Sequence, residues 1–108
     1  MVTGYEYSDE NNRNTTIVVG TSAVKVCDRL PKGIRKVLSL GNESTAGQII
    51  TLGFGNATAV NNGIPMRVGG KWTEVTDSGY EVTSGEVWAI SSGAGAILTI
   101  YERQKAVL

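Results

Sequence analysis

Acidic side chains are the residues of this chain best suited to acid–base chemistry or metal binding, because the sequence contains no histidine. Four of them lie close together in sequence, at Glu74, Asp77, Glu81 and Glu86. A pair of carboxylates can serve as the acid and the nucleophile of a glycosidase, and a group of them can bind calcium. These residues fall in or beside turns or alternate with apolar positions, however, and the sequence has no EF-hand loop. We therefore interpret them as solvated surface charges.

The absence of histidine excludes several kinds of site. Neither an imidazole base, nor a histidine metal ligand, nor a Ser-His-Asp or Cys-His arrangement can form. The single cysteine, Cys27, cannot make an intramolecular disulfide, which favours folding in the cytosol. It ends an alternating run that begins at Ala23, a position typical of a small packed side chain rather than a reactive thiol. We expect no catalytic residue, no cofactor and no metal.

Three aromatic side chains are the best candidates for binding a ligand: Trp72, Tyr80 and Trp88. Together they could form a platform that stacks on a sugar ring or a base. Each tryptophan lies within a run that alternates like a strand, however, and large aromatic side chains are typical of cores and oligomer interfaces. The interpretation we favour for these residues is therefore packing or an interface, with ligand stacking as the alternative.

The composition argues against nucleic acids and membranes as partners. The 108 residues include 10 Lys and Arg and 10 Asp and Glu, so no excess of positive charge attracts the chain to phosphate or anionic lipid. The glycine-rich stretches at 53–56 and 69–71 lack the spacing of a phosphate-binding loop. The first residues do not resemble a signal peptide, and the apolar stretches are shorter than the roughly 18 to 20 residues of a membrane helix. We expect a soluble protein.

The elements that carry these residues are predicted to be strands. Short runs rich in β-branched residues alternate with Gly, Asn, Asp, Ser and Pro, and no stretch has helical periodicity. We expect about eight or nine strands from the runs at 15–19, 23–27, 34–40, 48–54, 58–60, 64–68, 71–76, 80–82, 86–90 and 94–101.

Four of these runs carry more detailed predictions. The first two are expected to pair across a tight turn. The run at 34–40 places Lys36 and Leu38 on one face and Arg35 on the other, and the run at 48–54 is apolar on both faces and should be central.

The fold class that follows is all-β, as a single antiparallel β-sandwich that is jelly-roll-like. Residues 15–103 form this domain. Residues 1–14 are polar and are expected to be an N-terminal arm, and residues 104–108 a C-terminal tail whose Val107 and Leu108 can dock on a neighbour during assembly.

The second half of the chain also resembles a known group of proteins. Its segments GIPMRVGGKWTEV at 63–75, YEV at 80–82, GEVWAI at 85–90 and GAILTIYE at 95–102 are similar to small β-sandwich structural proteins of tailed phages and related viruses. Residues 35–42 and 48–55 look like the earlier part of the same pattern. The resemblance lies in the pattern of short strands and turns over roughly residues 15–103, and it includes no catalytic motif.

The resemblance implies a non-enzymatic virion protein, such as a capsid decoration or cement protein, or the base of a head fibre or spike. Its partners would be further copies of itself and a major capsid or other virion protein, after synthesis in the host cytoplasm. The alternative is a carbohydrate- or cell-surface-binding module whose exposed aromatic residues contact a glycan. A cupin-type enzyme is disfavoured because such sites usually bind metal through histidine.

Overall fold

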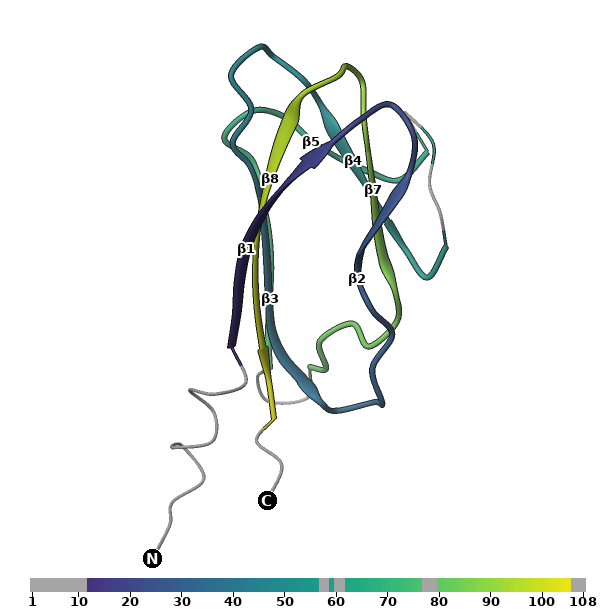
Figure 1. Cartoon of the computed structure of the whole chain (residues 1–108). Helices are drawn as coiled ribbons and strands as arrows, with labels where there is room; N and C mark the ends of the chain where they lie inside the picture. Colours follow the sequence, from purple (N-terminus) through teal and green to yellow (C-terminus); the bar gives the residue numbers. More distant parts are fainter. Residues whose placement is uncertain (1–11, 57–58, 60–61, 77–79, 106–108) are drawn as a thin grey trace, which may run out of the picture.

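The chain is folded into two antiparallel sheets packed face to face (Figure 1). The computed structural model describes residues 12–56, 59, 62–76 and 80–105, and these contain eight strands and no helix. The strands are β1 (Asn12–Val19), β2 (Val24–Cys27), β3 (Arg35–Asn42), β4 (Ile50–Phe54), β5 (Ile64–Met66), β6 (Lys71–Val75), β7 (Val87–Ser91) and β8 (Ala96–Gln104). The predicted all-β antiparallel sandwich is confirmed.

Each sheet has four strands. Sheet A has the order β1-β8-β3-β6, and sheet B has the order β2-β7-β4-β5. In sheet A, β1 pairs with β8 and β3 with β6, and in sheet B, β2 pairs with β7 and β4 with β5. All four pairs are antiparallel. The first strand therefore pairs with the last, and the pairing continues inward to the middle of the chain.

The predicted hairpin between the first two strands is wrong. β1 pairs with β8 in sheet A, whereas β2 pairs with β7 in sheet B. The chain crosses between the sheets after Val19, and Gly20 in this crossing accepts a hydrogen bond from the backbone N–H of Ser91 at 2.9 Å. Each of the two strands has one face that packs into the core. Because the strands lie in opposite sheets, Val19 and Val26 enter the same core from opposite sides.

The core lies between the sheets and consists of alternating apolar side chains. In the inner strands these are Leu38, Leu40, Ile50, Leu52, Val87, Ala89, Leu98 and Ile100, all at most 3% exposed. Strand β4 lies inside sheet B and Ile50, Thr51 and Leu52 are all buried, so the prediction of a central strand is confirmed.

A bulge at the start of β3 reverses the predicted orientation of Arg35. The register against β8 shifts between Arg35, opposite Gln104, and Val37, opposite Arg103. The extra residue, Lys36, places Arg35 on the same side as Leu38, where it is buried. The predicted placement of Arg35 on the face opposite Leu38 is therefore wrong, because strict alternation does not hold across a bulge.

The observed strands differ from the predicted runs near the ends of the domain. β1 begins at Asn12, three residues before the predicted strand, and Asn12 lies opposite Arg103 of β8. β8 continues to Gln104, and the N–H of Lys105 donates to the carbonyl of Ile34. Both ends of the domain thus lie at the same end of sheet A. Residues 1–11, Val107 and Leu108 are outside the described residues.

Two other predicted runs are not strands of the described chain. The run at 80–82 lies in the connection between β6 and β7, where Val82 packs into the core. The run at 58–60 falls largely outside the described residues, and Ala59 makes an isolated bridge to Asn62.

Candidate functional site

The aromatic side chains singled out in the sequence do not form one surface. Trp72 on β6 faces inward and packs against the core, with its ring centroid 5.6 Å from that of Phe54. Trp88 on β7 alternates with the buried Val87 and Ala89, so it projects from the outer side of sheet B, where its Nε1 donates to Glu86. Tyr80 lies in the connection after β6 and is 48% exposed.

Glu74 is buried, so the prediction of a solvated charge is wrong for this residue. Its Oε1 accepts the backbone N–H of Thr83 at 2.8 Å, and its Oε2 accepts Trp72 Nε1 at 2.7 Å and Thr83 Oγ1 at 3.1 Å. Burial raises the pKa of Glu74, but the hydrogen bonds from Thr83, Trp72 and Tyr80 outweigh burial and hold the pKa below its ordinary value. The carboxylate is a fixed acceptor for the connection between β6 and β7.

The other predicted surface carboxylates have ordinary environments. Glu81 is exposed and pairs with Lys32 at 3.5 Å, as expected of a solvated charge. Glu86 is partly exposed, lies 3.9 Å from Lys25 Nζ and accepts the Trp88 indole N–H. Asp77 is outside the described residues. The two described carboxylates, Glu81 and Glu86, thus each lie beside a lysine.

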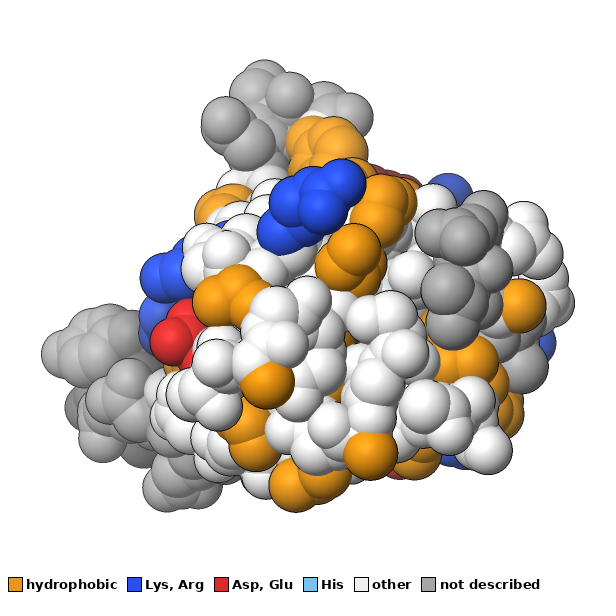
Figure 2. Space-filling model, turned by 90° about the horizontal axis from the view of Figure 1, so that it is seen from above, with side chains coloured by type: hydrophobic (Ala, Val, Ile, Leu, Met, Phe, Trp, Pro, Cys, Tyr) orange, Lys and Arg blue, Asp and Glu red, His pale blue; other side chains and the backbone are white. Residues whose placement is uncertain are grey.

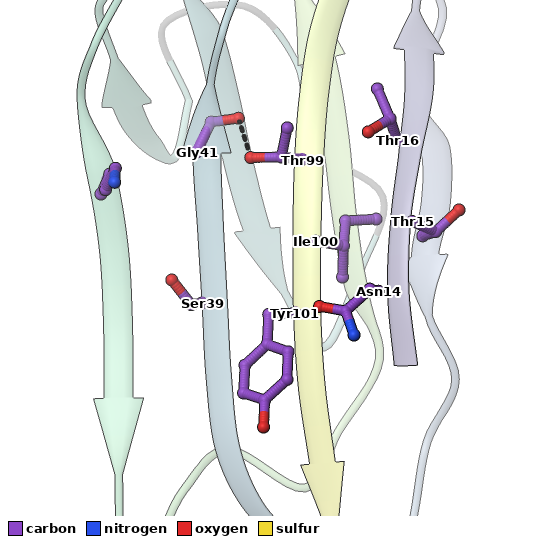
Figure 3. Close-up of a pocket in the computed structure, with 9 residues that line it drawn as sticks. Asn14, Thr15, Thr16, Ser39, Gly41, Thr99, Ile100 and Tyr101 are labelled. Atoms are coloured by element: carbon purple, nitrogen blue, oxygen red, sulfur yellow. Dashed lines mark hydrogen bonds between the residues drawn. The ribbon is translucent and has the colours of Figure 1, made fainter. Parts of the chain in front are cut away.

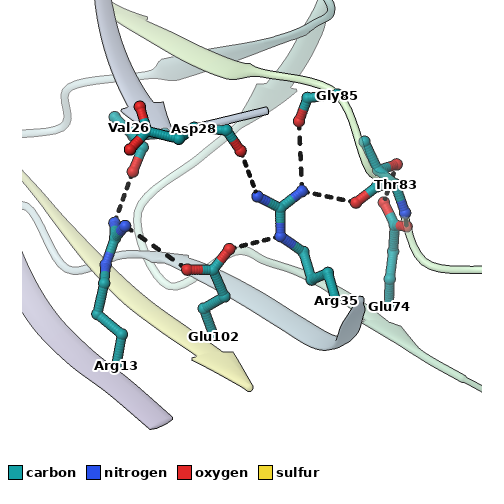
Figure 4. Close-up of polar contacts among 8 residues, drawn as sticks. All are labelled: Arg13, Val26, Asp28, Arg35, Glu74, Thr83, Gly85 and Glu102. Atoms are coloured by element: carbon teal, nitrogen blue, oxygen red, sulfur yellow. Dashed lines mark hydrogen bonds and ion pairs between the residues drawn. The ribbon is translucent and has the colours of Figure 1, made fainter. Parts of the chain in front are cut away.

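Arg35 is the centre of a buried polar cluster at the end of the sandwich where β3 begins (Figure 4). Its Nε donates to Glu102 of β8 at 2.5 Å, its Nη1 to the carbonyl of Thr83 at 2.6 Å and, more weakly, to that of Gly85 at 3.3 Å, and its Nη2 to the carbonyl of Asp28 at 2.7 Å. One side chain of sheet A thereby anchors the segment after β2 and the segment before β7. We call this end, with Arg13, Arg35, Glu74, Thr83 and Glu102, the charged end.

Arg13 completes the charged end from the neighbouring strand. Its Nη1 lies 3.6 Å from Glu102 Oε1, and its Nη2 donates to the carbonyl of Val26 at 2.6 Å (Figure 4). Glu102 therefore lies between two guanidinium groups. The charged groups of Arg35 and Glu102 are both buried. Because removing a charge from water is costly, each of these two groups depends on the other being present.

Cys27 lies beside this cluster and is buried. Burial raises the pKa of its thiol to about 11, Glu102 contributes to the increase, and Arg35 and Arg13 oppose it. The thiol is therefore protonated at neutral pH and is not a nucleophile.

Asn42 performs the corresponding role at the other end of β3. Its Nδ2 donates to the carbonyl of Gln48 and to that of Met66, both at 2.8 Å, and its Oδ1 accepts the N–H of Ser44 at 3.0 Å. Ser44 Oγ in turn accepts the N–H of Ile97 at 2.9 Å. We call this end, with Asn42, Ser44, Gln48 and Met66, the neutral end. Figure 2, which views the molecule from above, shows mostly uncharged side chains and backbone there.

The outer face of sheet A carries a shallow hollow of about 480 Å³ whose lining includes Gly41 (Figure 3). The strand register aligns two rows of outward residues across it. One row is Thr16, Thr99, Gly41 and Lys71, and the other is Asn14, Tyr101, Ser39 and Thr73. We call this surface the Gly41 hollow. Its lining side chains come from all four strands of the sheet and are mostly hydroxyl and amide groups.

Within the described residues, neither a cluster of metal ligands nor a membrane-crossing helix is found. No group of three or more His, Cys, Asp or Glu in this part of the chain could hold a metal ion. No helix in it is long and apolar enough to cross a membrane.

No model of a known protein family matches the chain, and no curated protein is similar to it in sequence.

Sequence reasoning missed the residues that organise both ends of β3. Alternation places Arg35 on the face opposite Leu38, and the bulge that buries it has no local signal in the sequence. Asn42 and Gly41 follow the predicted run at 34–40, so alternation within that run says nothing about them, yet Asn42 is buried.

Proposed function

We propose that this chain is a non-enzymatic structural protein of a virion. In this role it self-associates and attaches to a capsid shell, as a decoration or cement protein or as the base of a fibre or spike. The observation that carries the proposal is the strand pairing, in which the first strand pairs with the last and the pairing continues inward to β4 with β5.

This pairing supports the jelly-roll architecture that the proposal requires. A long antiparallel ribbon that is wrapped into two sheets gives the orders β1-β8-β3-β6 and β2-β7-β4-β5. Jelly rolls are the architecture of many viral capsid domains, and also of lectins and cupins. Because one fold hosts several functions, the surface and the interior must supply the rest of the argument.

The interior favours a rigid building block. Arg35 and Asn42 each hydrogen-bond to backbone carbonyls outside sheet A, so connections at both ends of the sandwich are fixed to the same central strand. Within the described residues every buried side-chain nitrogen or oxygen has a hydrogen-bond partner. A rigid body that keeps its shape loses little conformational entropy when it assembles into a shell.

The surface offers an edge for association with a second copy. Val18 near the end of β1 is 66% exposed, and Val24 at the start of β2 is 38% exposed. Both lie on edge strands and flank the crossing between the sheets. Exposed apolar side chains beside unpaired strand edges are favourable positions for contact with another chain.

The experiment that tests the proposal measures assembly of the full-length chain. Size-exclusion chromatography with light scattering should give a defined oligomer. The chain should also co-sediment with shells assembled from the major capsid protein that is encoded in the same genome. A chain that stays monomeric and does not bind such shells would overturn the proposal.

A pair of variants locates the self-association surface. Val18→Asp places a charge at the β1 edge and should shift the oligomer toward monomer. Val75→Asp changes a valine that is 51% exposed on β6, the opposite edge of sheet A, and should leave the oligomer unchanged. Both positions are exposed, so the free energy of unfolding should change by no more than about 0.5 kcal/mol in either variant.

A further inference from the structure

The glycine that lines the Gly41 hollow is not required by the backbone. Gly41 lies inside β3 and does not have a positive φ, so another residue could adopt its backbone conformation. A glycine within a strand costs roughly 0.5–1 kcal/mol relative to alanine. A Cβ at this position would lie 2.9 Å from Thr99 Oγ1 and 3.7 Å from Lys71 Cγ. The missing side chain therefore keeps the centre of the face open.

The hydroxyl groups around this opening make only long hydrogen bonds within the protein. Thr99 Oγ1 donates to the carbonyl of Gly41 at 3.4 Å, Ser39 Oγ and Thr73 Oγ1 are 3.2 Å apart, and Tyr101 OH donates to Asn12 Oδ1 at 3.3 Å. Hydrogen bonds between hydroxyl groups and oxygen acceptors are usually 2.7–2.8 Å long. These side chains can therefore exchange their present partners for those of a ligand at little cost.

The charge at the hollow is balanced. Lys71 lies at one side, and Glu43 Oε2 would be 3.6 Å from a Cβ on Gly41. Neither side chain has an ion pair within the described part of the chain, so one positive and one negative group face solvent close to the opening. A ligand of either charge would be attracted by one group and repelled by the other, which favours a neutral ligand with many hydroxyl groups.

We propose that the Gly41 hollow binds a neutral glycan. Hydroxyl and amide groups of Asn14, Thr16 and Ser39 offer both donors and acceptors for sugar hydroxyls, and the Tyr101 ring lies beside them along β8 (Figure 3). The volume of about 480 Å³ falls within the range of small-molecule sites, about 300–1,000 Å³. This site is on a different surface from Trp72, Tyr80 and Trp88, and it does not depend on the proposed structural role.

The test is a titration of the isotope-labelled full-length chain, followed by amide NMR spectra. The probes are neutral oligosaccharides of glucose, mannose, galactose and N-acetylglucosamine, with a sialylated trisaccharide and inorganic phosphate as charged comparators. At least one neutral oligosaccharide should give saturable shifts at the amides of residues 14–16, 39–41 and 99–101. Gly41→Val fills the opening and should weaken that binding at least about tenfold.

Matched variants separate lost binding from lost folding. Val75→Thr lies on the outer face of sheet A outside the hollow and should keep the affinity within about twofold. If Gly41→Val lowers the melting temperature, Thr16→Val replaces an exposed hydroxyl with a side chain of the same shape and should weaken binding without unfolding. Binding that is unaffected by these two variants would overturn the proposal.

Three further results would also overturn it. These are no shift with any neutral oligosaccharide up to roughly 10 mM, shifts with the charged probes alone, and shifts confined to Trp88 and Tyr80. Light scattering on the same samples reports self-association independently, so failure of the glycan site would not be confused with failure of the structural role.

Discussion

Strand β3 is tied to the rest of the sandwich at both of its ends, by a charged side chain at one end and by a neutral one at the other. Arg35 and Asn42 are both fully buried, and each donates to backbone carbonyls of segments outside sheet A. The hydrogen bonds are similar in length, 2.6 and 2.7 Å for the two short bonds of Arg35 to carbonyls and 2.8 Å for both bonds of Asn42. The two ends thus solve one mechanical problem with different electrostatics.

The difference lies in what each side chain requires from its neighbours. The guanidinium of Arg35 needs a counter-charge, which Glu102 supplies, and Glu102 is also contacted by Arg13. The amide of Asn42 needs only hydrogen-bond partners, since it carries no net charge. The charged end should therefore respond strongly to loss of one partner and to pH, whereas the neutral end should respond only to loss of hydrogen bonds.

The largest effect is expected from breaking the charged end. Arg35→Met leaves Glu102 buried without its closest partner and should lower the free energy of unfolding by about 3–5 kcal/mol, measured by urea denaturation. In the double variant Arg35→Met/Glu102→Met the unpaired charge is also removed, and most of the stability should return. A single variant as stable as the double variant would show that the ion pair does not distinguish this end.

A smaller effect is expected at the neutral end. Asn42→Ala leaves two carbonyls without their donor, of which that of Met66 is the more deeply buried. The free energy of unfolding should fall by about 1–3 kcal/mol in the same urea experiment. Because Asn42 carries no net charge, its removal leaves no unpaired charge that a second substitution would have to remove. A loss larger than that of Arg35→Met would reverse the proposed ranking of the two ends.

The contrast also explains how far the sequence leads. The class of fold and the central position of the β4 strand follow from alternation, because each depends on which face of a strand is apolar. The burial of Arg35 does not follow, because it depends on a bulge and on carbonyls contributed by distant connections. The pairing of β1 with β8 is similarly a property of the whole chain, since both strands would satisfy local rules in a hairpin.

Glu74 extends the charged end and gives it a pH dependence. Thr83 links it to Arg35, since the carbonyl of Thr83 accepts from Arg35 while its N–H and hydroxyl donate to Glu74. The folded pKa of Glu74 lies below its unfolded value, so its contribution to stability is present above the unfolded pKa. That contribution is lost as the pH falls through the folded pKa.

Glu74→Gln removes this titration. The variant should be less stable than the wild type by about 1 kcal/mol at neutral pH, and the difference should shrink as the pH falls through the acidic range. Melting temperatures measured across that range provide the check. Parallel curves for the two proteins would mean that Glu74 does not contribute to the acid sensitivity of this end.

The smallest expected effect is a difference in the reactivity of Cys27, which reports on local opening of the charged end and needs no further substitution. Burial raises the pKa of its thiol to about 11, so iodoacetamide should react with the native chain about a hundredfold more slowly than with an exposed cysteine. Opening of the contacts around Arg13 and Arg35 exposes this thiol. In Arg35→Met the reaction should therefore accelerate more than in Asn42→Ala, even at urea concentrations that give both variants the same global stability. Equal acceleration would mean that the two ends open together, as one cooperative unit, and that their different electrostatics have no local consequence.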